Sequence, residues 1–572
     1  MDFHEEIIAI VKKKKLSEKE LAKIKRELSL KYKLDKIPTN IEILLHATPK
    51  DLEQLKPKLL TKPVRTISGV APVAIMTKPD RCPHGKCTFC VGGIGSPWGD
   101  VPQSYTGHEP ATMRGMRNNY DAYLQVFSRL EQYILLGQNC EKVEIIVMGG
   151  TFTATPLEYQ NEFILGIFKA LNDFSTMFYN KSKKSTSNGK FNSTLNIFDY
   201  LKFKKFFELP GDITNKEREE RIKKKILALK FKKITSLEKE QKKNENSHIR
   251  CVALCIETKP DWGLLEQGNI MLDQGCTRVE LGIESVYDDV LKYVHRGHNS
   301  NDSKKSIQIL RDLGFKINFH YMPGLPLTDR KRDLEGMKQL FSDENYRPDM
   351  IKIYPCMVGP GTALYLQWKK GLFKPINSKE AMSLILEWKK YVPEYCRIQR
   401  IQRDVPTKFW EAGVEMTNLR QELFAKNKVV CRCIRCREPK TEKINWKKVS
   451  LKVQEFKSSG GREYFISAED SDNDLLIGFC RLRFPGQFLR REITPSSALI
   501  RELHVYGTAT AIGDAGKVQH KGWGRKLMQK AEEIVKINGR NKMIVISGVG
   551  VRGYYVKLGY KREGPYMVKK LI

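Results

Sequence analysis

Three cysteines lie in one short segment, Arg81-Cys-Pro-His-Gly-Lys-Cys-Thr-Phe-Cys90, and their spacing could support metal chemistry. Cysteine thiolates are the ligands of iron–sulfur clusters, so Cys82, Cys87 and Cys90 can hold three irons of a [4Fe–4S] cluster. The fourth iron would then lack a protein ligand and would be open to chelation by a small molecule. A zinc knuckle that uses His84 as its fourth ligand is the alternative for this loop.

A glycine pair adds a second chemical signal. Gly149, Gly150 and Thr151 follow the apolar run 143–148, which predicts a buried strand. A Gly-Gly pair after a strand is often only a tight turn. In radical S-adenosylmethionine (SAM) enzymes, however, such a pair follows a three-cysteine loop, and its backbone binds the methionine ammonium of SAM. The usual loop has three residues between its first two cysteines, whereas this chain has four.

Three further cysteines, Cys431, Cys433 and Cys436, lie within six residues. They can ligate one tetrahedral zinc ion, but a closed structural site needs a fourth ligand, which the sequence does not identify. A second iron–sulfur cluster is the alternative. Because this group lies between two domain patterns, we expect it to pin those domains together.

The C-terminal part of the chain has the pattern of an acyl-CoA module. Strands are predicted at 475–483 and 498–507, and the loop from Gln519 to Arg525 leads into a helix at 526–536. The loop has the form Gln-x-x-Gly-x-Gly, which presents backbone N–H groups to a pyrophosphate at a helix N-terminus. Preceded by a strand that can pair with a pantetheine arm, this loop predicts a GNAT acetyltransferase domain.

Alternating strand and helix patterns between residues 64 and 400 must position the cysteine loop and the glycine pair. The predicted strands are 143–150, 250–257, 277–284, 316–322 and 350–355, with helices such as 303–313 and 333–341 between them. Such units favour a parallel sheet curled into a full or partial barrel, whose active site lies at the carboxyl ends of the strands. That edge would carry Gly149, Gly150, Glu257, Glu284 and His320.

The formal net charge of +34 makes nucleic acid the first partner to consider, although a lysine-rich proteome is an alternative source of the charge. The N-terminal region is one basic segment, with a helix opened by the capping box Ser17-x-x-Glu20. An insertion at about 175–247 is another, with 19 Lys and Arg against nine Asp and Glu. Its residues 181–190 are low in complexity and predict disorder, whereas 217–243 predict one or two helices.

No apolar run is long enough to cross a bilayer, and the N-terminus lacks the pattern of a secretory signal. The cysteines cluster in metal-like spacings instead of forming a disulfide framework, which implies a reducing compartment. We therefore expect a cytoplasmic protein with no membrane partner.

Nearly the whole chain resembles the catalytic subunit of Elongator in its archaeal form. The motifs that carry the resemblance lie at 62–71, 82–90, 147–152, 256–261, 278–285, 320–326, 417–421, 431–436, 501–507 and 545–555. They include Val-Met-Gly-Gly-Thr-Phe, Arg-Val-Glu-Leu-Gly-Ile-Glu-Ser and Arg-Glu-Leu-His-Val-Tyr-Gly. Two features depart from the family: Lys259 replaces an expected arginine, and the basic insertion has no counterpart.

The resemblance implies an enzyme that installs a carboxymethyl group on C5 of the wobble uridine of tRNA. In the family's proposed mechanism, reductive cleavage of SAM gives a radical that takes hydrogen from the methyl group of acetyl-CoA. The resulting carbon radical attacks uridine C5, and hydrolysis frees CoA. The implied cofactors are a [4Fe–4S] cluster, SAM and acetyl-CoA, with Zn²⁺ at the second cysteine group.

The resemblance also assigns residues to acetyl-CoA. Lys142, Tyr554 and Tyr555 are the candidate catalytic residues, although Lys142 alone would be taken as a solvated lysine and the tyrosines as core aromatics. The candidate acetyl-CoA contacts are Lys142, Glu502, Leu503, His504, Val505, Gln519, Gly522, Trp523, Gly524, Arg525 and Tyr555.

These inferences predict an α/β fold class, in which a radical SAM partial (β/α) barrel is joined to a C-terminal GNAT α/β domain. The expected parts are a basic helical tRNA-binding region (1–62), a radical SAM domain (63–400) with the basic insertion (about 175–247), a linker with the zinc site (401–445) and the GNAT domain (446–572). A single-stranded anticodon loop would need a basic track, which the N-terminal helices and the runs 397–403 and 432–437 could supply. A homodimer or Elongator-like subunits remain possible partners.

Two rival functions remain open. The first is a protein lysine acetyltransferase with a structural iron–sulfur domain, in which Glu502 or His504 would act as the base. The second is a tRNA-binding scaffold with a degenerate cluster, which the intact cysteines and glycine loop argue against. A protein acetyltransferase needs neither a radical cluster nor strong positive charge, so the tRNA-modifying enzyme is favoured.

Overall fold

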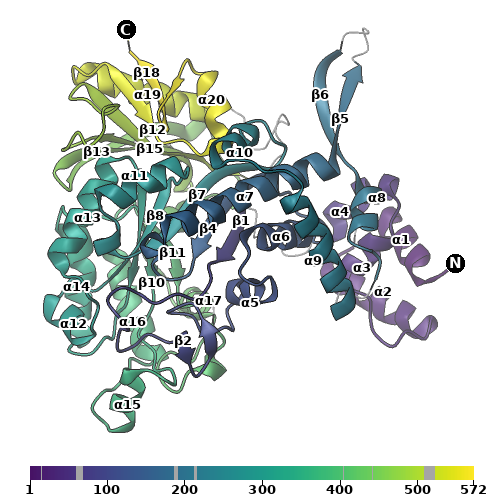
Figure 1. The fold of residues 1–572 in the computed structure, drawn as a ribbon, viewed down its shortest axis with the longest axis horizontal. Helices are drawn as coiled ribbons and strands as arrows, with labels where there is room; N and C mark the ends of the chain where they lie inside the picture. The colour runs from purple at the N-terminus through teal and green to yellow at the C-terminus, as the bar shows by residue number, and fades with distance from the viewer. Residues whose placement is uncertain are drawn as a thin grey trace.

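The structure is a computed structural model, and it describes residues 1–14, 16–59, 69–185, 191–211, 215–403, 405–440, 442–507 and 522–571. Two large sheets dominate it, and the N-terminal helices lie to one side (Figure 1). Among the described residues, no helix is both long and apolar enough to span a membrane.

The first sheet has seven strands that are all parallel and follow one another in chain order. They are β1 (Ala71–Met76), β4 (Lys142–Met148), β7 (Arg250–Thr258), β8 (Arg278–Glu284), β9 (Lys316–Tyr321), β10 (Met350–Ile353) and β11 (Arg397–Ile401). The connecting helices of this part are α5 (Pro110–Arg117), α6 (Ala122–Leu135), α7 (Leu157–Phe178), α11 (Leu265–Asp273), α12 (Asp288–Tyr293), α13 (Ser300–Asp312), α14 (Arg330–Ser342), α15 (Ala363–Lys369) and α16 (Ser378–Trp388). The predicted curled parallel sheet is confirmed.

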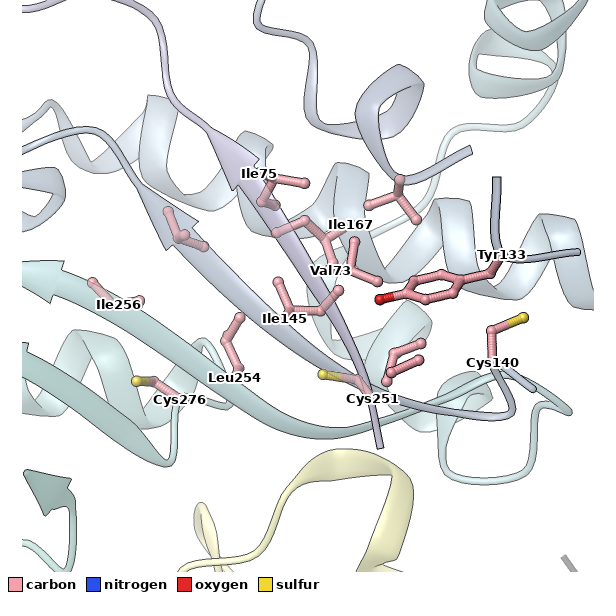
Figure 2. Packing of buried hydrophobic residues seen from close by; sticks show 14 of the residues in the cluster. Val73, Ile75, Tyr133, Cys140, Ile145, Ile167, Cys251, Leu254, Ile256 and Cys276 are labelled. Carbon is pink, nitrogen blue, oxygen red and sulfur yellow. The ribbon is translucent and has the colours of Figure 1, made fainter. Parts of the chain in front are cut away.

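Alternation along the strands separates an apolar outer face from a polar inner face. Figure 2 shows the apolar face, where side chains of β1, β4 and β7 meet helices α6 and α7, among them Val73, Ile75, Tyr133, Ile145, Ile167, Leu254 and Ile256. Burying each aliphatic side chain stabilises the fold by about 1.5 to 3 kcal/mol. Cys140, Cys251 and Cys276 fill the same core, and burial raises the pKa of each of these thiols to about 12.

The N-terminal helices are α1 (Phe3–Lys13), α2 (Glu18–Lys31), α3 (Asn40–His46) and α4 (Pro49–Leu59), and the predicted capping box opens α2. The basic insertion packs against them, because Tyr200 Oη donates to the Leu44 carbonyl (3.2 Å) and Lys204 Nζ to the Leu45 carbonyl (2.8 Å). It contains α8 (Tyr200–Phe206), α9 (Lys216–Phe231) and α10 (Leu237–Asn244), which confirms the helices predicted in 217–243.

Disorder was predicted for 181–190, and for 181–185 this is wrong, while 186–190 lie outside the described residues. The backbone of β5 (Tyr179–Ser185) pairs antiparallel with β6 (Phe191–Phe198) and extends from the body of the molecule (Figure 1). Ladder hydrogen bonds satisfy the backbone of such a hairpin even where the sequence offers few apolar side chains.

The second sheet is mixed and has the order β12-β13-β14-β15-β16-β18-β17. Its strands are β12 (Val449–Ser458), β13 (Gly461–Asp470), β14 (Leu475–Phe484), β15 (Ser497–Val505), β16 (Lys542–Val545), β17 (Lys561–Glu563) and β18 (Tyr566–Lys570). Every pair is antiparallel except β15 with β16. Helix α19 (Trp523–Ile537) covers one face, and α20 (Arg552–Val556) follows β16. The strands and helix predicted here are therefore present as β14, β15 and α19.

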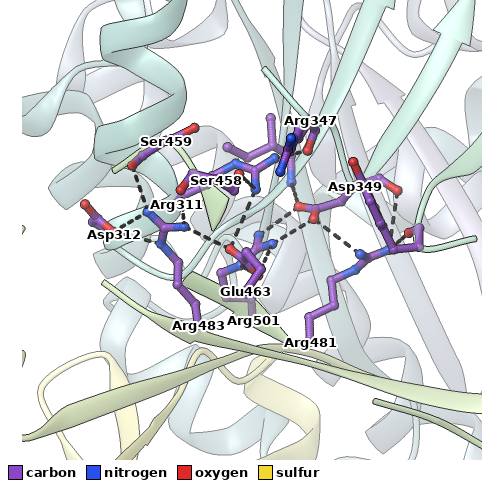
Figure 3. Close-up of polar contacts among 12 residues, drawn as sticks. Arg311, Asp312, Arg347, Asp349, Ser458, Ser459, Glu463, Arg481, Arg483 and Arg501 are labelled. Atoms are coloured by element: carbon purple, nitrogen blue, oxygen red, sulfur yellow. Dashed lines mark hydrogen bonds and ion pairs between the residues drawn. The ribbon is translucent and has the colours of Figure 1, made fainter. Parts of the chain in front are cut away.

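A buried network of charges joins the two sheets (Figure 3). Asp349, just before β10, forms a bidentate pair with Arg501 of β15, with oxygen–nitrogen distances of 2.7 and 2.8 Å. Glu463 of β13 accepts from Arg501 (2.9 Å) and Arg483 (3.0 Å), and Arg483 also reaches Asp312 at the end of α13 (2.8 Å). Burial alone would raise the pKa of Asp349, but Arg501 and its neighbours outweigh burial and hold that pKa far below its usual range.

We expect Asp349→Asn to destabilise the protein by about 3 to 5 kcal/mol, because removing one partner leaves buried guanidinium groups uncompensated. The measurement is the unfolding free energy or the midpoint of thermal unfolding. The matched control is Glu335→Gln, which removes an exposed ion pair with Lys338 (3.1 Å) and should leave stability nearly unchanged. Equal effects of the two substitutions would contradict a structural role for the buried network.

Candidate functional site

The cysteine loop lies at the carboxyl ends of the parallel strands, directly after β1. The sulfur of Cys82 lies 3.6 Å from Thr151 Oγ1, and that of Cys90 lies 3.6 Å from Ser104 Oγ. Burial raises the pKa of all three thiols, while the guanidinium of Arg296, 3.7 Å from the Cys87 sulfur, lowers the pKa of Cys82 and Cys87. Buried thiols with such a cation beside them are suited to become thiolate ligands of a metal centre.

The spacing of the three sulfurs distinguishes a cluster from a zinc knuckle. One tetrahedral zinc ion draws its sulfur ligands to about 4 Å from one another, since each Zn–S bond is about 2.3 Å. Among the described residues, Cys82, Cys87 and Cys90 do not form a group whose ligand atoms all lie within 4.8 Å, even with His84 included. A cluster would hold each cysteine on a separate iron, so its three sulfurs need not converge on one metal ion, and the lack of such a compact group among the described residues argues against the zinc knuckle.

The glycine pair after β4 has a conformation that only glycine adopts without strain. Gly149 and Gly150 have φ values of 138° and 92°, and a Cβ atom on Gly149 would lie 1.8 Å from Thr77 Oγ1. Thr151 follows immediately and contacts the Cys82 sulfur. The structure thus brings the predicted SAM residues Gly149, Gly150 and Thr151 together with the cysteine loop.

Lys259, the departure from the expected arginine, keeps a positive charge beside this loop. Its side chain is almost fully buried and pairs with Asp261 (3.1 Å). Its charge and that of Arg296 both lower the pKa of Cys82 against the effect of burial. The substitution therefore preserves the local electrostatics of the cysteine loop.

The inner face of the curled sheet carries a buried polar group that sequence reasoning found only in part. Glu280 accepts from His320 Nε2 (2.9 Å) and pairs with Lys352, and Lys352 also lies 3.8 Å from Glu257. Tyr105 Oη donates to Glu257 (2.7 Å). Burial would raise the pKa of Glu280, but Lys352 and His320 lower it well below its usual range.

The sequence had suggested Glu257 and His320 but not Glu280 or Lys352. The alternation of polar residues in β8 and β9 would have placed Arg278, Glu280 and His320 on one face. Glu284, also expected at this edge, ends β8 with a φ of 64° and pairs with Arg296 (3.4 Å). Left-handed backbone at a residue other than glycine is strained and is concentrated at functional sites.

The residues expected to bind acetyl-CoA lie at the opposite end of the strands. Lys142 begins β4, whereas Gly149 follows its end, and a strand of seven residues spans about 20 Å. The turn after β16 lies against β7 beside Lys142, because a Cβ atom on Gly550 would lie 2.5 Å from that of Arg250, the register partner of Lys142. Glu502 of β15 pairs with Lys316 at the amino end of β9. The structure therefore does not bring Lys142 close to Gly149.

Part of the predicted acyl-CoA loop is visible. Gly522 has a φ of 80° and immediately precedes α19, so Trp523, Gly524 and Arg525 form the first turn of that helix. A Cβ atom on Gly524 would lie 2.8 Å from the Tyr554 hydroxyl and 3.9 Å from a methyl of Val505. Gln519 lies outside the described residues. The glycine turn, Tyr554 and the end of β15 thus meet at one place.

Strand β15 also has the form that a pantetheine arm requires. Its parallel ladder with β16 ends at the pair Ile500–Val545, but β15 continues to Val505 against β14. Leu503, His504 and Val505 therefore lie beyond the last rung shared with β16. A strand edge of this kind can pair with an extended amide-containing ligand.

The two tyrosines differ in exposure. Tyr554 is 39% exposed and faces Gly524, whereas Tyr555 is 6% exposed and belongs to the core between the second sheet and α19. Burial raises the pKa of both phenols. The geometry makes Tyr554 the tyrosine that can contact a ligand at the glycine turn.

The second cysteine group is compact. The ligand atoms of Cys431, Cys433 and Cys436 lie within 4.8 Å of one another, and hydrogen bonding with its two neighbours lowers the pKa of Cys433 well below its usual range. These sulfurs can hold one zinc ion, although the described residues provide only three members of the group. The group joins both sheets, since Ile434 N donates to the Cys396 carbonyl (2.9 Å) and Arg437 Nη1 to Glu469 (2.8 Å). The group follows α17 (Leu419–Lys426) in the chain. Cys431 and Cys433 precede α18 (Ile434–Arg437), and Cys436 lies in that helix.

The expected basic track for RNA is only partly available. Arg397 pairs with Glu438 (2.7 Å), and Arg437 is buried against Glu469, so both are structural. Arg432 pairs with Glu394 (2.6 Å) at the surface. Lys12, Lys13 and Lys14 of the N-terminal region are exposed, although Lys12 pairs with Asp51 (2.6 Å).

Three family models match parts of the chain. Residues 1–67 match the ELP3 N-terminal domain, residues 208–335 the radical SAM superfamily and residues 348–429 the radical SAM C-terminal domain. The chain is 42% identical to a tRNA uridine(34) acetyltransferase of Methanocaldococcus jannaschii, over 98% of this chain and 95% of that protein. It is 37% identical to human Elongator complex protein 3, over 96% of this chain and 93% of that protein.

A solved structure agrees with the fold. The archaeal Methanocaldococcus infernus Elp3 with an N-terminal deletion superposes with a TM-score of 0.69 at 37% identity. The similarity covers 88% of this chain and all of that one. The arrangement of the two sheets is therefore shared with an experimentally determined relative.

The two cysteine groups should bind different metals independently. We expect Cys87→Ser to lose iron and the visible absorbance of the cluster while keeping zinc, because Cys87 is placed only in the first group. Cys431→Ser should lose zinc and keep the cluster. Elemental analysis of anaerobically reconstituted protein measures both, and loss of iron from the Cys431 variant alone would contradict the assignment.

Proposed function

Because the chain belongs to the family that contains Elongator complex protein 3 and the archaeal tRNA uridine(34) acetyltransferases, we propose that it modifies the wobble uridine of tRNA. The reaction we propose is transfer of a carboxymethyl group, derived from acetyl-CoA, to C5 of that uridine. The observation that carries it is the joining of a radical SAM half-barrel, with its three-cysteine loop, to a second sheet with an acyl-CoA-type glycine turn.

The residues present fit the cofactors that this reaction needs. Cys82, Cys87 and Cys90 would hold a [4Fe–4S] cluster, and the backbone of Gly149 and Gly150 would hold SAM. When bound, these groups supply radical chemistry able to remove hydrogen from an unactivated methyl group, which acid–base chemistry cannot do at neutral pH. A zinc ion on Cys431, Cys433 and Cys436 would stabilise the linker.

At the other end of the strands, the chain would hold acetyl-CoA. The amide groups at the start of α19 would donate to the pyrophosphate, and the helix dipole would favour its negative charge. The part of β15 that continues past β16, at Leu503 and His504, would pair with the pantetheine arm. The hydroxyl of Tyr554, over Gly524, would donate a hydrogen bond to the thioester carbonyl.

Transfer of a hydrogen atom requires contact, yet the two groups of residues lie at opposite ends of β4. We place the route between them along the inner face of the half-barrel, where Glu144, Arg278 and Glu280 form an ion-paired column. This column continues to the Lys316–Glu502 pair on the acyl side. The acyl group would enter from the amino ends of the strands, shielded from bulk water by both sheets.

The geometry does not favour a protein lysine acetyltransferase. Such an enzyme needs a base near the thioester, but Lys316 and Arg481 outweigh the effect of burial and lower the pKa of Glu502 to about 2. Burial lowers the pKa of His504 to about 4, which makes it a weak base. Both of the suggested bases are therefore poorly matched to deprotonating a lysine ammonium.

The test is an anaerobic reaction of reconstituted protein with a reductant, SAM, acetyl-CoA and unmodified tRNA, followed by mass spectrometry of the nucleosides. We expect 5-carboxymethyluridine from the native chain and none from Cys87→Ala. Tyr554→Phe should lower the yield by about tenfold or more, since it removes one hydrogen bond from the thioester.

The control for that variant is Tyr293→Phe, which changes a partly exposed tyrosine of α12 outside the proposed sites. It should leave the yield unchanged. Acetylation of lysine peptides with no modified uridine, by protein with an intact cluster, would overturn the proposal.

A further inference from the structure

Three aromatic rings from separate parts of the sequence meet near the cysteine loop, and we call Trp98, His108 and Phe409 the aromatic platform. The rings of His108 and Phe409 are stacked with centroids 3.8 Å apart and an interplanar angle of 7°. The ring of Trp98 stands edge-on to both, at 5.8 Å from His108 and 5.9 Å from Phe409. His108 is exposed, and Trp98 and Phe409 are half-buried, so the platform lies at the surface.

The backbone holds each ring in place. Trp98 lies in the turn between β2 (Gly93–Ser96) and β3 (Gly99–Val101), where its amide donates to Ser96 Oγ (3.3 Å) and its indole to the Pro360 carbonyl (3.3 Å). His108 lies in a turn closed by Glu109, whose carboxylate accepts from the Thr106 amide (2.9 Å). Phe409 ends a short 3₁₀ turn that begins at Thr407. Rings fixed in advance lose little conformational entropy when they bind a ligand.

The platform lies beside the cysteine loop. A Cβ atom on Gly359 would lie 2.7 Å from Val91, the residue after Cys90, and 3.0 Å from the ring of Trp410, which follows Phe409. Gln103 accepts from the Cys82 amide (2.7 Å), and its side chain would lie 3.1 Å from a Cβ atom on Gly93 of β2. Gly359 therefore lies between the cysteine loop and the segment of Phe409, and Gln103 lies between that loop and the hairpin of Trp98.

Exposed cations lie on the same segments as the platform and on the cysteine loop. Lys408 places its ammonium 5.1 Å from the centre of the Phe409 ring. Lys78, Arg81 and Lys86 are exposed on the cysteine loop. Two of the acidic groups here are already engaged with backbone amides, since Asp100 accepts from Gly95 (2.8 Å) and Glu109 from Thr106 (2.9 Å), whereas Glu411 is exposed.

Surface rings with cations beside them suit a single-stranded nucleic acid, because bases stack on aromatic faces while cations neutralise the phosphates. A protein partner would not require this charge, whereas a polyanion does. An RNA base that is to be modified must leave its stack, and the bases beside it then lose a stacking neighbour.

We propose that the aromatic platform stacks a base adjacent to the target uridine in the anticodon loop and so presents that uridine to the site beyond the cysteine loop. This inference rests on the proposed function and adds a specific contact to it. The exposed face of His108 or of Trp98 replaces the stacking that the neighbouring base loses. The platform is thus a positioning surface and takes no part in the radical chemistry.

The test uses reconstituted full-length protein and an anticodon stem–loop RNA with 2-aminopurine on either side of the target uridine. We expect native protein to quench the probe at one of the two positions through stacking. Trp98→Ala and His108→Ala should each reduce the quenching. Each should also weaken RNA binding by about 5-fold to 100-fold, because one base loses its stacking partner.

Three comparisons separate stacking from other effects. Trp98→Phe should restore binding, because a smaller ring still stacks. Tyr391→Ala, which removes an aromatic ring that is 48% exposed elsewhere on the surface, should bind as the native protein does. Lys408→Ala should reduce the salt dependence of binding, whereas Trp98→Ala should leave that slope unchanged.

Equal binding and equal quenching by native protein and the Trp98 and His108 variants would overturn the platform. So would a native protein that binds the RNA without quenching either probe, or that does not bind the stem–loop. The nucleoside assay decides the proposed function separately. Formation of 5-carboxymethyluridine by a Trp98→Ala variant with native affinity would leave that function standing while the platform falls.

Discussion

The buried charges between the two sheets set the geometry of the whole molecule. Asp349 and Glu463 each bind arginines from the second sheet, and Arg481 of β14 connects Asp349 (3.4 Å) to Glu502 of β15 (2.9 Å). These contacts hold β15 next to the amino ends of the parallel strands. Buried ion pairs contribute little net stability, but their directional hydrogen bonds can fix one arrangement of the groups they join. For this chain, the arrangement is the position of the acyl-CoA edge relative to the half-barrel.

That arrangement explains why the inside of the sheet is polar. The outer face meets helices and is apolar, as Val73, Ile145 and Leu254 illustrate. In the part of the chain that the structure describes, no helix covers the inner face, which lies between the cysteine loop at one end and the second sheet at the other. Glu280, Lys352 and Arg278 satisfy one another there by ion pairs, which gives a charged column where an ordinary closed barrel packs branched aliphatic side chains. The polar interior therefore lies between the proposed SAM site and the proposed acetyl-CoA site.

Local sequence signals predicted much of this fold and site. The alternation of strands and helices predicted the parallel sheet, and the glycine patterns predicted the turns at Gly149 and Gly522, where the structure has φ above zero. The predicted strand from 143 to 148 already separated Lys142 from Gly149 by its full length, but the sequence could not show which parts of the second sheet lie beside Lys142. The resemblance named Tyr555 as the acetyl-CoA contact, whereas the structure buries Tyr555 and leaves Tyr554 partly exposed, a difference in the face of α20 that the sequence does not reveal. Contacts between distant segments, such as Trp98 with Phe409, leave no pattern in a single sequence.

The most direct test of the account is a reaction with acetyl-CoA whose methyl group is fully deuterated, in the presence of wobble-uridine tRNA. The account predicts that 5′-deoxyadenosine gains one deuterium and that the modified uridine retains two, and that both depend on the tRNA. Unlabelled 5′-deoxyadenosine, with the deuterated acetyl group found intact on protein lysines, would contradict it. The first result would show that the two ends of the half-barrel act on one methyl group.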